Sequence, residues 1–121
     1  MGKLILVVED QEDNRRILRD LLTSSGFEVV EAVNGIEGVR LAEKLIPDLI
    51  LMDIQLPGID GYEATRQIKA KANLASIPII VVTSYALSGD DKKAYDAGCD
   101  EYVAKPFSPR KLLAKVRNFL S

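Results

Sequence analysis

The stretch Leu49-Ile50-Leu51-Met52-Asp53-Ile54-Gln55-Leu56-Pro57-Gly58 predicts a buried β-strand that ends in a carboxylate shortly before a turn. An unbroken apolar run of this length suits a strand covered on both faces, and the Pro-Gly pair marks the turn. Two other apolar runs also end in charged residues. Residues 4–8 lead into Glu9-Asp10, and residues 101–104 lead into Lys105-Pro106. We therefore expect a functional site at these strand ends.

Strand and helix patterns alternate five times along the chain. Strands are predicted at residues 4–8, 27–32, 49–53, 79–83 and 101–104. Helices are predicted at about 14–25, from the cap Asn34 through Leu45, at roughly 61–72, at about 89–97, and from the cap Ser108 through Leu120. Gly26 and Gly98 suit helix ends, and Glu37 stands in a capping-box relation to Asn34. The helix at 89–97 is the least apolar, so we expect it to be the most mobile.

Apolar residues at helical spacing predict which side of each helix is buried. The expected inner residues are Ile17, Leu18, Leu21 and Leu22; Ile36, Val39 and Leu45; Tyr62, Ala64, Thr65 and Ile68; and Leu112, Leu113, Val116, Phe119 and Leu120.

This alternation predicts an α/β fold: a flavodoxin-like, doubly wound (βα)5 sandwich with a five-stranded parallel sheet of order 2-1-3-4-5 and helices on both faces. In that order the first and third strands are neighbours. Glu9, Asp10 and Asp53 then lie close together at the carboxyl edge of the sheet, with Lys105 nearby. Crowded carboxylates oppose one another's ionisation unless a cation lies among them. The pattern therefore predicts a Mg²⁺ site used in phosphoryl chemistry.

Composition narrows the functional classes. The chain has 121 residues, 47% of them hydrophobic, with a net charge of −2 and scattered basic residues. One domain is expected, with no nucleic-acid or membrane partner. A single Cys99 and the lack of an apparent signal peptide favour a cytoplasmic protein. The chain contains no histidine, so a histidine that donates a phosphoryl group must belong to another protein.

Four motifs in register carry a resemblance to a known family: Val8-Glu9-Asp10, Met52-Asp53-Ile54-Gln55-Leu56-Pro57-Gly58, Val82-Thr83-Ser84 and Ala104-Lys105-Pro106. Over essentially the whole chain they resemble the receiver domain of bacterial response regulators. The organisation is similar to that of CheY-like and DivK-like single-domain receivers. We therefore expect residues 1–121 to form one receiver domain without an output domain.

The resemblance implies a role for each site residue. Asp53 is the expected phosphoacceptor. Mg²⁺, which Mn²⁺ could replace, is expected on Asp10, Asp53 and the backbone carbonyl of Gln55, with Glu9 acting through water. Lys105 is expected to pair with Asp53 at rest and with the phosphoryl group afterwards, and the following bond to Pro106 is expected to be cis.

The resemblance also implies a switch and its partners. Thr83 and Tyr102 correspond to the family's switch pair, although Tyr102 also suits ordinary strand packing and Thr83 is a common strand residue. A histidine kinase or histidine phosphotransfer protein is the expected donor. A protein effector is expected at the face made by the helix at 89–97, the strand at 101–104 and the last helix. The protein is expected to be a monomer or weak dimer that catalyses only its own phosphorylation and dephosphorylation.

Some positions depart from the usual family pattern. Ser84 stands where alanine is common, and its role is not assigned. Tyr85 and Gln55 flank the expected path of a hydrolytic water, so we expect slow self-dephosphorylation.

Rival functions have specific sequence requirements. A haloacid-dehalogenase-type enzyme needs a second aspartate two residues after the nucleophile, where this chain has Gln55. A flavin-binding domain needs a phosphate-cradling loop after the first strand, where this chain has residues 9–13, Glu-Asp-Gln-Glu-Asp. A pseudo-receiver that is never phosphorylated has no need of the intact acids and Lys105.

Overall fold

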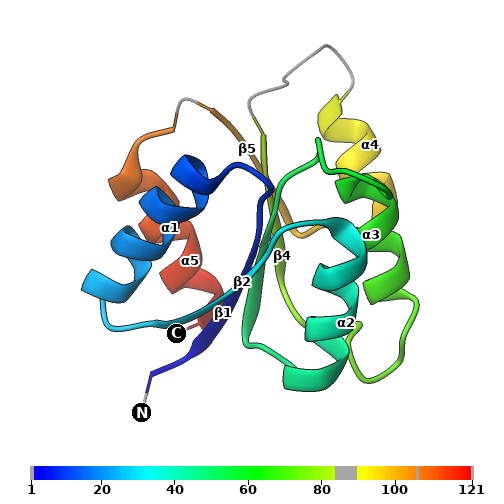
Figure 1. Cartoon of the computed structure of the whole chain (residues 1–121), viewed down its shortest axis with the longest axis horizontal. Coiled ribbons are helices and arrows are strands. Elements are labelled where there is room, and N and C mark those ends of the chain that lie inside the picture. Colours follow the sequence, from blue (N-terminus) through cyan, green and yellow to red (C-terminus); the bar gives the residue numbers. More distant parts are fainter. Residues whose placement is uncertain (1, 84–89, 106, 121) are drawn as a thin grey trace.

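The computed structural model describes residues 2–83, 90–105 and 107–120, and Figure 1 shows their arrangement. Within these residues, five parallel strands form a sheet of order β2-β1-β3-β4-β5, which confirms the predicted fold. The strands are β1 (Leu4–Val8), β2 (Glu28–Ala32), β3 (Leu49–Met52), β4 (Ile79–Thr83) and β5 (Glu101–Ala104). The helices are α1 (Glu12–Ser24), α2 (Gly35–Leu45), α3 (Gly61–Lys69), α4 (Asp90–Ala97) and α5 (Pro109–Leu120).

Helices cover both faces of the sheet: α1 and α5 lie on one face, and α2, α3 and α4 lie on the other (Figure 1). Alternate residues of each strand contribute to the two sides. In β1, for example, Ile5 and Val7 pack with α1 and α5, whereas Leu6 and Val8 pack with α2 and α3. This two-sided burial explains why the inner strands are continuous apolar runs in the sequence. Among the described residues, no helix is both long enough and apolar enough to cross a membrane.

Local capping fixes where several helices begin and end. Asn34 Oδ1 accepts a hydrogen bond from the backbone N–H of Glu37 at 2.8 Å, as predicted. The Glu37 carboxylate bonds the N–H of Val33 at 2.9 Å, one residue before the position that a capping box uses. Asp60 caps α3 in the same manner, accepting from Glu63 N–H at 2.9 Å. Gly26 follows α1 with a φ of 93°, a conformation that favours glycine.

The third helix differs from its predicted length, since α3 ends at Lys69 and not near residue 72. Lys71 N–H donates to Ile68 O at 3.1 Å, and Leu74 N–H donates to Lys71 O at 3.0 Å. These turns place Leu74, which is fully buried, in the core. Tertiary burial of Leu74 therefore outweighs the local helical tendency of the segment.

Smaller differences concern other boundaries and the helix faces. α1 begins at Glu12, two residues earlier than predicted, and β2 begins at Glu28 because Phe27 N–H closes the end of α1 on Leu22 O. Four residues predicted to be inner are exposed: Ile17 (55%), Ile36 (62%), Leu45 (38%) and Phe119 (37%).

Candidate functional site

Three carboxylates meet at the carboxyl edge of the sheet. Val8 pairs with Met52 in the β1–β3 register, so the residues that follow them, Glu9 and Asp53, leave neighbouring strands side by side. Asp53 N–H donates to Val8 O at 3.0 Å and extends this pairing. One oxygen from each of Glu9, Asp10 and Asp53 lies within 4.8 Å of the others. The acid trio, as we call these three residues, can therefore offer oxygen ligands to one hard cation.

Burial sets the electrostatics of the acid trio. Asp53 is 9% exposed, and its Oδ1 accepts a hydrogen bond from Ile54 N–H at 2.7 Å. Burial, followed by the charge of Glu9 and a hydrogen bond with it, raises the pKa of Asp53 to about 7. Burial also acts to raise the pKa of Glu9, but contacts with Lys105 and the Gln11 N–H outweigh it and hold this pKa below its usual value. Asp53 therefore resists ionisation unless a further positive charge is present.

Lys105 contacts the acid trio from the end of β5. Its Nζ lies 2.8 Å from Glu9 Oε1, and the side chain is 14% exposed. The lysine was expected to pair with Asp53, so its partner in this structure differs from the prediction. Glu9 is 1% exposed, and the ion pair with Lys105 offsets the loss of solvation of its carboxylate. Pro106 lies outside the described residues, and its peptide bond stays a prediction.

The two expected switch residues occupy β4 and β5. Thr83 is fully buried at the end of β4, where its carbonyl accepts a hydrogen bond from Lys105 N–H at 2.7 Å. Tyr102 pairs with Val81 in the sheet and packs, half-buried, against the core beneath α2, α3 and α4. Thr83 therefore reaches the lysine through the backbone, whereas Tyr102 lies on the side of the expected effector face. Ser84 and Tyr85 lie outside the described residues.

The loop after β3 brings the backbone close to Asp53. Gln55 is exposed in this loop, which Gly58 turns with a φ of 79°. Gly61 then begins α3, and its N–H donates to Ile54 O at 2.8 Å. A Cβ atom on Gly61 would overlap the carbonyl oxygen of Asp53 and lie 2.7 Å from Ile54 Cα. The absence of a side chain at Gly61 therefore allows α3 to pack directly on the backbone of Asp53.

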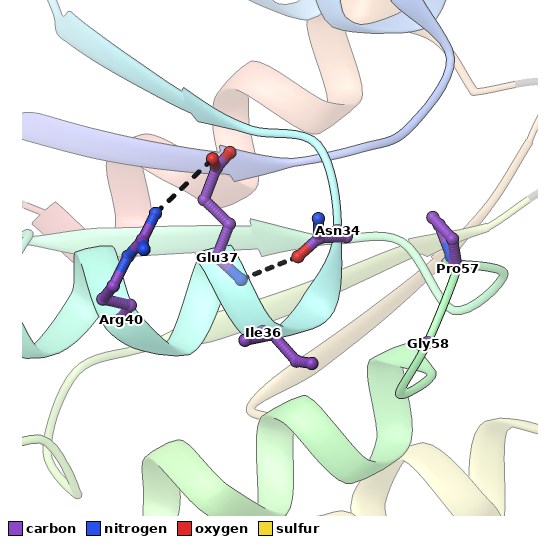
Figure 2. A pocket seen from close by; sticks show the side chains of 6 residues that line it. All are labelled: Asn34, Ile36, Glu37, Arg40, Pro57 and Gly58. Carbon is purple, nitrogen blue, oxygen red and sulfur yellow. Dashed lines mark hydrogen bonds and ion pairs between the residues drawn. The ribbon is translucent and has the colours of Figure 1, made fainter.

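Cavities border this edge of the sheet. One of about 350 Å³ lies between the start of α2 and the loop after β3, where Ile36, Pro57 and Gly58 line it (Figure 2). Another, of about 290 Å³, has Lys105 in its wall together with Ile17 and Phe107. The exposed Ile17 and Ile36 thus each lie in the wall of a cavity.

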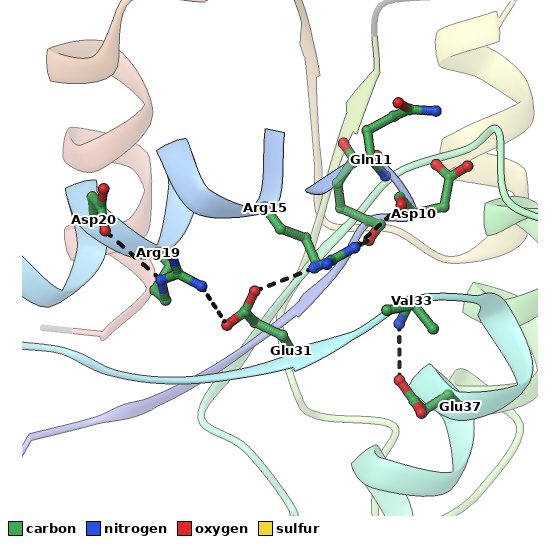
Figure 3. Close-up of polar contacts among 9 residues, drawn as sticks. Asp10, Gln11, Arg15, Arg19, Asp20, Glu31, Val33 and Glu37 are labelled. Atoms are coloured by element: carbon green, nitrogen blue, oxygen red, sulfur yellow. Dashed lines mark hydrogen bonds and ion pairs between the residues drawn. The ribbon is translucent and has the colours of Figure 1, made fainter. Parts of the chain in front are cut away.

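Arg15 is a site residue that the sequence analysis missed. Its side chain reaches back from the first turns of α1 to the backbone of Glu9 and Asp10 (Figure 3). The contact joins a helix side chain to backbone atoms, so no side-chain pattern in the sequence indicated it. Only its position five residues after Asp10, about one and a half helical turns, could have served as a hint.

A doubly wound sheet that gathers three acids and a lysine at its carboxyl edge is the architecture of a signal-receiver domain. Residues 5–117 match the response regulator receiver domain, and the chain belongs to this family. The resemblance inferred from the four sequence motifs is thereby confirmed.

Individual relatives agree with this assignment. The chain is 41% identical over 120 residues to the polar-differentiation response regulator DivK of Brucella anthropi, covering 99% of this chain and 98% of that protein. It is also 41% identical to the receiver domain of a sensor histidine kinase from Pseudomonas aeruginosa, solved with a magnesium ion coordinated in the active-site cleft. That match covers 99% and 98% of the two chains with a TM-score of 0.93. A CheY-like receiver domain from Methanospirillum hungatei is 32% identical, with 99% and 94% coverage and a TM-score of 0.90.

Proposed function

We propose that residues 1–121 act as one receiver domain that accepts a phosphoryl group on Asp53 in a Mg²⁺-dependent reaction. The phosphorylated form then signals to a protein partner. The observation that carries this proposal is the acid trio, in which one oxygen of each residue lies within 4.8 Å of the others, beside the partly buried side chain of Lys105. Phosphoryl transfer depends mainly on positioning and charge neutralisation, and these groups supply both.

Each site residue has a distinct role in phosphoryl transfer, set by its charge and its position. A bound Mg²⁺ ion would neutralise phosphoryl oxygens and orient them, held by Asp10, Asp53 and the carbonyl of Gln55, with Glu9 acting through water. Asp53 is the nucleophile, and burial keeps its carboxylate out of bulk water. Lys105 leaves Glu9 to contact a phosphoryl oxygen, and Thr83 donates its hydroxyl to another. The oxygen-rich, partly buried donor set fits a hard cation with retained waters.

The phosphoryl donor and the effector that binds the phosphorylated form are other proteins. The chain has no histidine, so a histidine kinase or histidine phosphotransfer protein supplies the phosphoryl group. The movement of Thr83 frees space for Tyr102, and a change in Tyr102 packing alters the face made by α4, β5 and α5. An effector binds there. The protein works in the cytoplasm as a monomer or weak dimer and has no catalytic turnover beyond its own aspartyl phosphate.

Labelling with acetyl phosphate tests this proposal. We expect intact-mass spectrometry to show one added phosphoryl group in the presence of Mg²⁺ and none after chelation. Asp53→Asn should abolish the addition, because the amide oxygen is not a nucleophile of comparable strength. Asp60→Asn is the matched control: it lies outside the acid trio, and asparagine retains the cap of α3. Labelling that survives in Asp53→Asn, or that ignores the chelator, would overturn the proposal.

A further inference from the structure

Arg15 joins the backbone of the acid trio to β2 through hydrogen bonds and an ion pair (Figure 3). Arg15 Nη1 donates to the carbonyl oxygen of Glu9 at 3.0 Å and to that of Asp10 at 3.2 Å. Its Nε donates to Glu31 Oε1 on β2 at 3.2 Å. The second Glu31 oxygen accepts from Arg19 Nη1 at 3.1 Å. One guanidinium therefore connects two peptide carbonyls of the acidic loop to a fixed point in the sheet.

This contact is built into the fold more firmly than a surface ion pair. The Arg15 side chain is 15% exposed, and that of Glu31 is 27% exposed. Water competes little for groups buried to this extent, so their hydrogen bonds hold a defined geometry. By comparison, Arg16 on the same helix is 56% exposed and pairs with Asp13, which is 84% exposed. Adjacent arginines thus occupy very different environments.

The two carbonyls matter because they fix the peptide planes on both sides of the Asp10 α-carbon. The direction of the Asp10 side chain follows from those planes, since backbone torsions set the Cα–Cβ direction. Gln11, the residue that caps α1, makes no side-chain capping bond. Among the described residues, the Arg15 guanidinium donates side-chain hydrogen bonds to both of these carbonyls. Mg²⁺ requires near-ideal octahedral geometry, so a misdirected ligand weakens binding strongly.

We propose that Arg15 is a positioning residue: its guanidinium aligns the Glu9 and Asp10 carbonyls so that the Asp10 carboxylate is oriented before a cation arrives, with Glu31 as the anchor. This inference rests on the proposed cation site. Lysine cannot replace arginine here, because a single ammonium group cannot span the carbonyls and Glu31 in a planar fork. Residues that orient metal ligands in this way contribute about 10- to 100-fold to metal affinity.

The direction of the change in Mg²⁺ affinity distinguishes a positioning role of Arg15 from a purely electrostatic one. Arg15 carries a positive charge near the cation site, and two like charges repel each other. If charge alone mattered, Arg15→Gln would tighten Mg²⁺ binding. Positioning requires the opposite: we expect Arg15→Gln and Arg15→Lys both to weaken it about tenfold. Arg16→Gln, which removes the same charge from the neighbouring exposed position, should leave the affinity within about twofold because its side chain is solvated.

Isothermal titration of the metal-free full chain with MgCl₂ measures these affinities. Glu31→Gln should weaken binding less than Arg15→Lys, and the two changes together should cost no more than Arg15→Lys alone, because both break one chain of contacts. Amide exchange of the metal-free protein supplies a readout independent of the metal. Exchange at Gln11, whose N–H bonds the Glu9 carboxylate, should quicken in Arg15→Lys, while the amides of β1 keep their protection.

The outcomes separate the two proposals. Arg15 variants that bind Mg²⁺ like the wild type, or more tightly in Arg15→Gln, would overturn the positioning role, as would an unchanged Gln11 amide. A loss of thermal stability without a loss of affinity would show a merely structural contact. A wild-type chain that binds no Mg²⁺ would overturn the proposed function itself, and the Gln11 amide would still decide whether Arg15 orders the loop.

Discussion

At the scale of single residues, the site depends on positions where the backbone and the charges are unusually close. Gly61 lets α3 approach the carbonyl of Asp53, and the acid trio places three carboxylates within 4.8 Å. Substitutions at the two places should change stability in opposite directions. An added atom at Gly61 creates overlap and should destabilise the protein, whereas removing a charge from the trio relieves repulsion and should stabilise it.

Gly61→Ala should destabilise the protein, although glycine to alanine in a helix normally stabilises it by up to about 1 kcal/mol. The new Cβ would overlap the Asp53 carbonyl oxygen, a backbone atom that cannot move without shifting β3. We expect a loss of about 2 kcal/mol in the free energy of unfolding by urea denaturation, together with weaker Mg²⁺ binding.

Gly26→Ala is the control for this effect. Gly26 has a φ of 93°, and no heavy atom lies within 4 Å of the position that a Cβ would take there. The substitution should therefore cost about 1 kcal/mol of backbone strain and leave Mg²⁺ affinity unchanged. Equal affinity losses in both variants would contradict the close approach at Gly61.

Asp10→Asn should raise the melting temperature of the metal-free protein. Removing one of three crowded negative charges relieves repulsion by about 1 kcal/mol, which is roughly 4 °C for a domain of this size. Added Mg²⁺ should then stabilise the variant less than the wild type, because a ligand is lost. Thermal melts with and without Mg²⁺ measure both effects.

Asp13→Asn is the matched control, because Asp13 lies in the first turn of α1 and pairs with Arg16 at the surface. Its loss should lower stability by about 0.3 to 0.5 kcal/mol, since it removes a favourable helix-dipole interaction. An Asp10→Asn protein that melts below the wild type without metal would argue against repulsion within the trio.

At the scale of elements, the helices differ in how firmly they are held. α1 and α5 bury large side chains such as Leu18, Leu22 and Leu112 against the sheet. The buried residues described in α4 are alanines, Ala94 and Ala97, and Tyr95 on the same helix is 47% exposed. Apolar burial stabilises a helix in proportion to area, so α4 gains less from packing than its neighbours. The effector face proposed for α4, β5 and α5 requires such a weakly packed helix.

Amide hydrogen exchange should therefore be faster in α4 than in α1 and α5. Local opening needs less free energy where few large apolar contacts break. We expect the interior amides of α4 to exchange about tenfold faster, or more, than the slowest amides of α1 and α5 in the unphosphorylated protein, measured by NMR. Comparable protection in all three helices would show that the switch surface lies elsewhere.

At the scale of the whole molecule, the described core residues form two clusters, one on each face of the sheet. Cys99, which is 7% exposed, belongs to the cluster beneath α2, α3 and α4. Burial, followed by the charge of Asp100, raises the pKa of the Cys99 thiol to about 11. The thiol is therefore a neutral core side chain, and its ionisation lowers the free energy of unfolding.

Stability from Cys99 should be lost at alkaline pH. The pKa is higher in the folded protein than the ordinary value of 9.0, so the contribution is complete below about pH 9 and is lost as pH rises from there towards about 11. We expect a loss of roughly 1 kcal/mol between about pH 8 and about pH 10, measured by urea denaturation. Cys99→Ala is the reference, because other groups titrate in the same range. If the difference between wild type and Cys99→Ala stays constant with pH, the thiol is not held neutral by burial.

The sequence alone determined the strand order and the residues of the acid trio. Apolar runs, their alternation with helices and the acids at their ends are local patterns, and the parallel topology brings strand ends to one edge for any side chains that follow. For the same reason the sequence alone identifies Glu9, Asp10, Asp53 and Lys105 as residues at the carboxyl ends of strands.

Only the tertiary structure decided which of these side chains touch. Lys105 pairs with Glu9 and not with Asp53, because the choice depends on how the fold places two acids from different strands relative to the end of β5. Arg15 reaches the carbonyls of the acidic loop because α1 lies against β2, where Glu31 holds the guanidinium. Leu74 ends α3 early because a buried site for it exists between distant elements. Each of these outcomes depends on distances across the fold, which no local pattern in the sequence contains.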